Sequence, residues 1–202
     1  MRELRQALAE INAIRTQVAR ETQFRGYGPL STAASGVLAI LVAGGQSLWL
    51  KPYEGDVSVF LLVWVITAVL AASVCAWETL MRTRKAHFGF CKEMIQAAIE
   101  QIVPALVVGL MLTVVLAQAA PQVLWMLPGL WALAFSLGVF ASCRFLPRPM
   151  FAAGLWYLVA GLACLMIESG TRELSPWSMG VSFGIGQLLV AAVLKYGAGS
   201  AV

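Results

Sequence analysis

The sequence predicts an all-α polytopic membrane protein, with six transmembrane helices in three hairpins and an amphipathic cytoplasmic helix ahead of them. Composition is the first reason. Of 202 residues, 60% are hydrophobic and only 12% are charged, and the mean hydropathy is +0.81. Soluble domains carry roughly 45–50% apolar and about 25% charged residues. Because so few charges could not cover a folded chain in water, we expect lipid to be its solvent.

Six long uncharged apolar runs are the second reason. Each has about 18–24 residues, enough to cross a hydrocarbon core of roughly 30 Å at about 1.5 Å per residue. Because lipid offers backbone groups no hydrogen-bond partners, each run must be a helix. The spans are expected near 29–50, 57–80, 102–120, 123–143, 150–167 and 177–194. They form one transmembrane domain, 29–195, with a tail at 196–202.

The first 28 residues predict a separate amphipathic helix. Leu4, Leu8, Ile11 and Val18 recur at helical spacing, and Arg and Glu fill the other positions. This helix either lies on the inner leaflet or pairs with a protein, and its narrow stripe without Trp favours a protein contact. A second amphipathic stretch, 82–101, is expected to run into the third span.

The distribution of Lys and Arg predicts the orientation, because basic residues in short loops stay cytoplasmic. With six spans, twelve of the 14 basic residues fall on the side of the N-terminus, and only Lys51 and Arg172 fall on the other. We therefore expect a multi-pass protein of the bacterial inner membrane with both termini in the cytoplasm. The segment CRFLPRPM (143–150) is then a cytoplasmic turn, in which Pro147 and Pro149 keep two helices from fusing.

Tryptophan placement fits this arrangement. Four tryptophans fall at the ends of spans, where an interfacial belt is expected: Trp49, Trp77, Trp125 and Trp177. Three lie deeper and are expected to pack between helices: Trp64, Trp131 and Trp156.

Catalytic chemistry is scarce in this sequence. The only histidine, His87, and the only aspartate, Asp56, are expected on opposite sides of the membrane, which excludes a Ser-His-Asp triad within one chain. One histidine also excludes HExxH zinc sites and bis-histidine haem ligation. The four cysteines lack paired spacing and are expected to be reduced. We therefore predict a protein that is not an enzyme and has no cofactor and no metal.

Polar groups near span ends are the best candidates for a site. Glu78, with Arg82 four residues on, ends the second span, and Glu100 and Gln101 precede the third. Glu78, Glu100 and Gln101 together form the candidate polar site near the cytoplasmic face. Glu168 closes the fifth span and is expected to be interfacial. The pair Pro128-Gly129 would kink the fourth span and free a carbonyl group.

Basic side chains on the cytoplasmic side are candidate contacts for anionic lipid headgroups or for a cytoplasmic protein. They are Arg15, Arg20, Arg25, Arg82, Arg84, Lys85, Arg144 and Arg148. The sequence pI of about 9.1 reflects this surface, so direct nucleic-acid binding is not expected.

Small residues at four-residue spacing mark a helix-packing face on the sixth span. Gly180 and Gly184 let two helices approach closely, either within the bundle or across a homodimer. Packing within the bundle is the favoured interpretation. Ala68, Ala72 and Ala76 repeat the same spacing on the second span.

The stretch WMLPGLWALAFSLGVFASCRFLPRPM (125–150) resembles a family of uncharacterised bacterial six-span integral membrane proteins of similar length. The resemblance extends over most of the chain. It implies a cytoplasmic protein partner of the winged-helix regulator class and no catalytic residues.

The function predicted from these features is an interaction or regulatory role, in which basic amphipathic helices dock a cytoplasmic or membrane partner. A small transporter or channel for a neutral or apolar solute is the alternative, since six spans permit an inverted repeat. An enzyme acting on lipids fits least, because His and Asp are nearly absent.

Overall fold

The structure is a computed structural model that describes residues 28–50, 56–85, 89–143 and 149–196. Side chains are described for 28–50, 56–78, 81, 103–143 and 149–196. Within these ranges the chain is helical and has no strand. The elements are α2 (Pro29–Trp49), α3 (Val57–Lys85), α4 (Gly89–Ala119), a 3₁₀ helix η2 (Pro121–Met126), α5 (Leu127–Ser142), α6 (Met150–Thr171) and α7 (Pro176–Tyr196).

The all-α fold is confirmed within the described residues, and its helices are compatible with a multi-pass membrane protein. Five segments are long and apolar enough to cross a membrane: Pro29–Trp49, Val57–Glu78, Pro121–Ser142, Met150–Thr171 and Pro176–Tyr196. The predicted third span corresponds to the apolar segment Val103–Ala119 inside α4, which starts where the described side chains of this helix start. The predicted N-terminal amphipathic helix, 1–28, and the predicted tail, 196–202, fall almost wholly outside the described residues.

Several helix boundaries differ from the predicted ones. The stretch 82–101 is divided, because its beginning ends α3 at Lys85 and the part from Gly89 starts α4. The part from Gly89 continues without a break into the apolar segment Val103–Ala119. Helix α4 continues through Pro104, as membrane helices tolerate when neighbouring groups take up the freed carbonyl. Pro128 does not kink a long helix but stands in the first turn of α5, where its missing N–H costs no hydrogen bond.

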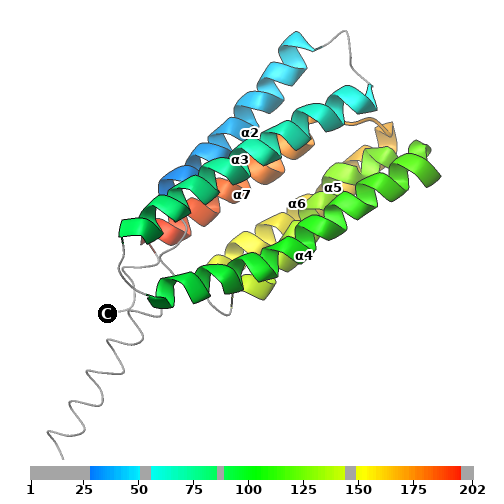
Figure 1. Cartoon of the computed structure of the whole chain (residues 1–202). Coiled ribbons are helices and arrows are strands. Elements are labelled where there is room, and N and C mark those ends of the chain that lie inside the picture. The colour runs from blue at the N-terminus through cyan, green and yellow to red at the C-terminus, as the bar shows by residue number, and fades with distance from the viewer. Residues whose placement is uncertain (1–27, 51–55, 86–88, 144–148, 197–202) are drawn as a thin grey trace, which may run out of the picture.

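The helices form two groups of three, with α2, α3 and α7 in one and α4, α5 and α6 in the other (Figure 1). Close packing runs in the order α3–α2–α7–α6–α5–α4, so α3 and α4 are the two edge helices. We call the end of the bundle with Gly28 and the last turn of α7 the Gly28 end. The opposite end, where α2 and α6 finish and α3 and α7 begin, is the Trp49 end.

Glycines set the closest helix contacts. A Cβ placed on Gly36 would lie 2.7 Å from the Gly184 carbonyl oxygen, and one on Gly180 would overlap Ala43. In the other group, a Cβ on Gly129 would lie 2.8 Å from the Gly161 carbonyl oxygen. Such contacts replace the hydrophobic effect, which lipid does not supply between helices, with van der Waals packing.

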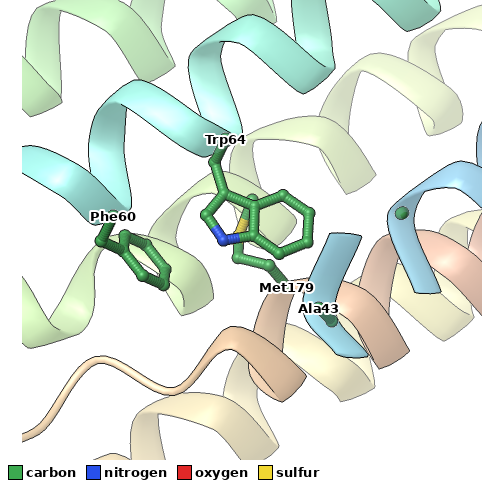
Figure 2. Close-up of a cluster of buried hydrophobic side chains, with 5 residues drawn as sticks. Ala43, Phe60, Trp64 and Met179 are labelled. Carbon is green, nitrogen blue, oxygen red and sulfur yellow. The ribbon is translucent and has the colours of Figure 1, made fainter. Parts of the chain in front are cut away.

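Helix α3 is held to this core by its first turns. Trp64, only 3% exposed, lies over Met179 of α7 beside Ala43 of α2, and Phe60 packs next to it (Figure 2). The rest of α3 has few neighbouring helices. Only 17% of Val57–Glu78 is buried, compared with 44% of Pro121–Ser142. The side of α3 away from α2 is therefore apolar and exposed, as a lipid-facing helix requires.

The other two deep tryptophans also join helices, as predicted. The Trp131 indole donates to the Thr113 hydroxyl at 2.9 Å and ties α5 to α4. The Trp156 indole donates to the Ser182 carbonyl oxygen at 2.9 Å and ties α6 to α7. Because buried indole N–H groups need a partner, each bond fixes the depth at which its two helices meet. Trp49 and Trp77, in contrast, are exposed at opposite ends of the bundle.

Candidate functional site

Glu78, one of the predicted site residues, lies at the start of α2. Its carboxylate accepts a hydrogen bond from the Ser31 backbone N–H at 3.1 Å. A Cβ added at Gly28 would overlap this carboxyl group, so Gly28 leaves the space that Glu78 fills. Local capping is missing here, because Gly28 has no side chain, and the Ser31 and Thr32 hydroxyls donate back to the Gly28 carbonyl oxygen.

This arrangement makes Glu78 a tertiary cap. The first N–H groups of a helix have no partner within it, and its positive dipole end favours a carboxylate. From α3, Glu78 provides an acceptor for one of these N–H groups and a negative charge at the positive end of α2. It therefore joins α3 to the start of α2. This geometry gives Glu78 a structural role at the start of α2.

The other members of the predicted polar site are described only in part. Glu100 and Gln101 lie in α4, just before its apolar segment, and their side chains are outside the described set. The same holds for Arg82, Arg84 and Lys85 in the last turns of α3. The remaining basic candidates are not among the described residues: Arg15, Arg20, Arg25, Arg144 and Arg148.

Gly180 and Gly184 lie at the contact between α7 and α2. Gly184 faces Ile40 and the Gly36 carbonyl oxygen, and Gly180 faces Ala43. Both glycines are buried within one chain, in the most extensive helix pair of the bundle. Ala68, Ala72 and Ala76, with the same spacing on α3, are exposed.

Glu168, which the sequence did not place in a site, is the most unusual polar group of the described structure. Glu168, in the last turn of α6, is 2% exposed and not interfacial as expected. Both carboxyl oxygens are buried, and neither has a hydrogen-bond partner. The neighbouring polar groups are the Ser178 side chain and the Ser175 backbone amide at the start of α7, but neither meets hydrogen-bond geometry.

The surroundings of Glu168 are weakly polar. One turn earlier on α6, the Cys164 thiol lies 3.4 Å from the Ser182 hydroxyl and 3.8 Å from the Ser178 carbonyl oxygen. One turn later, Arg172 is exposed and adopts a left-handed conformation, with φ of 57°, that ends the helix. The Arg172 backbone amide donates to the Glu168 carbonyl oxygen at 2.7 Å. Glu168 thus lies at the end of α6, next to the short connection to α7.

The periodicity of α6 could have revealed the burial of Glu168. The buried residues of this helix recur every three or four positions: Met150, Ala153, Gly154, Tyr157, Gly161, Cys164 and Glu168. Most are small, as at a helix-packing face, and Glu168 continues that face to the last turn. Extending the stripe beyond the apolar run would have placed the carboxylate inside.

Metal chemistry finds no support in the described part of the chain. No three His, Cys, Asp or Glu side chains gather there, and Cys75, Cys143 and Cys164 form no disulfide. Cys91 lies among the undescribed side chains.

The described structure thus offers two carboxylates set into the bundle near its opposite ends. Glu78 caps a helix, whereas Glu168 is buried without a partner. No protein-family model, curated protein or solved structure matches this chain.

Proposed function

We propose that this chain is a non-enzymatic, multi-pass protein of the bacterial inner membrane with an interaction or regulatory role. In this proposal it crosses the membrane six times, with both termini in the cytoplasm. A cytoplasmic protein docks on the basic helical surface at the Gly28 end, and anionic lipid headgroups border that surface.

The single observation that supports this proposal is the length of the two edge helices. Helix α3 continues seven residues past Glu78, the first charged residue after its apolar run, and α4 begins 14 residues before Val103. At about 1.5 Å per residue, these extensions reach roughly 10 Å and 21 Å beyond the apolar part. They carry Arg82, Arg84 and Lys85, and the N-terminal 27 residues join the bundle at the same end.

Helical extensions suit docking because a helix that is continuous with its membrane segment holds the exposed residues in a fixed orientation. A partner that binds side chains on such extensions loses less freedom than one that must order a loop. The basic residues also attract acidic surfaces, which speeds the encounter and favours acidic partners.

The sixth crossing in this proposal is α4. Its uncharged apolar run is 102–119 in the sequence, inside a helix that is continuous from Gly89 to Ala119. At about 1.5 Å per residue, these 18 residues reach about 27 Å, close to the thickness of the hydrocarbon core.

Native mass spectrometry of the full chain in native-lipid nanodiscs tests the proposal. We expect a protein bound at fixed stoichiometry. The triple variant Arg82→Glu, Arg84→Glu, Lys85→Glu should lose this partner, and so should a chain without residues 2–25. The matched control is Arg172→Glu, a charge reversal at the Trp49 end, which should keep the partner.

Two outcomes would contradict docking of a protein. Retention of every partner by both the triple variant and the truncated chain removes the basic extensions from the interaction. A chain that carries only bound lipid or a small solute favours the membrane itself or transport, and liposome flux assays then decide between these.

A further inference from the structure

Glu168 carries an inference independent of the docking proposal. We propose that Glu168 is a proton-binding site: in the folded bundle at neutral pH its carboxyl group is protonated and neutral, and it is the group through which the Trp49 end of the bundle responds to pH.

No hydrogen-bond donor is in place to stabilise a negative charge on the Glu168 carboxyl group. Glu168 is 2% exposed, and neither oxygen accepts a hydrogen bond. An ionised carboxylate buried without partners is costly enough that such a group takes up a proton instead. A neutral carboxylic acid loses most of that cost.

The described elements packed around Glu168 carry no charged side chain near it. Helix α6 packs against η2, α5 and α7, and neither η2 nor α5 contains an ionisable side chain. The ionisable side chains of α7, Lys195 and Tyr196, stand at the opposite end of that helix. The nearest charged residues along the chain, Arg172 and Glu173, are both exposed.

The surroundings of Glu168 also favour a proton over a metal ion. A metal ion such as Na⁺ or Ca²⁺ needs several oxygen ligands around it. The described polar groups around Glu168 are the Ser178 side chain and the Ser175 backbone amide at the positive start of α7, and that positive helix end disfavours a metal cation. A proton needs one acceptor. Once bound, it also makes the carboxyl group a donor that can turn towards the Ser178 hydroxyl.

Deprotonation then has a structural consequence. The charged carboxylate can be stabilised only by entering water or by taking hydrogen bonds from the first turn of α7. Either change moves the last turn of α6 relative to α7. Protonation of Glu168 is therefore coupled to the packing of the last turn of α6 against the start of α7, at the Trp49 end.

Infrared difference spectroscopy of the full chain in lipid nanodiscs tests the proposal. At neutral pH we expect a carbonyl stretch of a protonated carboxylic acid that disappears in Glu168→Gln. The matched control Glu173→Gln, at an exposed neighbouring carboxylate, should keep the band. A folded wild-type chain without this band at neutral pH would have an ionised Glu168, which overturns the proposal.

Variant stability provides the second readout. A neutral side chain of similar size should suffice, so Glu168→Gln and Glu168→Met should both fold at neutral pH. If both fail to fold while Glu173→Gln folds, the ionised carboxylate is required and the proposal is wrong. A band that disappears on addition of Na⁺ or K⁺ at constant pH would also overturn it, because the site would then bind a metal cation.

Discussion

The Glu78 carboxylate accepts a hydrogen bond from the Ser31 backbone N–H at 3.1 Å, across 47 residues of sequence. It fills the space left by Gly28 and supplies the cap that α2 lacks locally. Together with Trp64 near the other end, this contact attaches edge helix α3 to the rest of the bundle at two points.

Loss of the Glu78 cap should weaken that attachment. We expect Glu78→Ala to lower the free energy of unfolding by about 1 kcal/mol, as removal of a helix cap does. Gly28→Ala should destabilise to a similar extent, because the new Cβ displaces the carboxyl group. Unfolding in mixed micelles with increasing SDS measures both variants. Glu173→Ala, at an exposed carboxylate, is the control and should change little. Unchanged stability of both Glu78→Ala and Gly28→Ala would refute the capping role.

The Gly36–Gly184 contact should be sensitive to a single methyl group. In Gly36→Ala the Cβ would lie 2.7 Å from the Gly184 carbonyl oxygen, a backbone atom that cannot rotate away. We expect α2 and α7 to separate, at a cost of about 1–3 kcal/mol typical of overpacking. Gly44→Ala, on the same helix with no atom within 4 Å of its new Cβ, is the matched control. It should be neutral or slightly stabilising, because alanine favours helices. Equal effects of the two variants would contradict the close approach.

Removal of Trp64 should release the first half of α3. A soluble core loses about 3–5 kcal/mol on Trp→Ala, but lipid can replace part of the lost contact, so we expect about 2 kcal/mol here. Proteolysis or hydrogen exchange in nanodiscs should show increased access at 56–64. Trp77→Ala, on the same helix but 65% exposed, should have little effect on packing. A similar loss in both variants would mean that Trp64 does not anchor α3.

The orientation is testable with single-cysteine chains and a membrane-impermeant maleimide. Cys143 follows the apolar segment at the Gly28 end, and Glu173→Cys places a thiol in the exposed turn at the Trp49 end. We expect Glu173→Cys to react in intact cells and Cys143 only in inverted vesicles. Burial raises the pKa of the Cys143 thiol, so less thiolate is present at neutral pH and labelling should accelerate as the pH rises. The opposite pattern of labelling would reverse the proposed orientation.

The sequence by itself determined that the chain is helical and adapted to lipid. Low charge and long apolar runs leave the backbone no partner except its own helix, which is why the predicted spans at 29–50, 57–80 and 177–194 closely match α2, α3 and α7. It also placed the deep tryptophans in the packing correctly, because large aromatic side chains far from the span ends fill the space between helices.

Only the tertiary structure decided which helices meet and which polar groups are enclosed. The contact between Gly36 and Gly184 joins segments nearly 150 residues apart, and every apolar face in a membrane chain looks alike along the sequence. Glu78 and Glu168 both stand near the ends of spans, and their positions in the sequence suggest the same interfacial setting. The helix opposite each makes the difference, because the start of α2 offers Glu78 a free backbone N–H, whereas Glu168 is enclosed at the start of α7 with no partner in hydrogen-bond geometry.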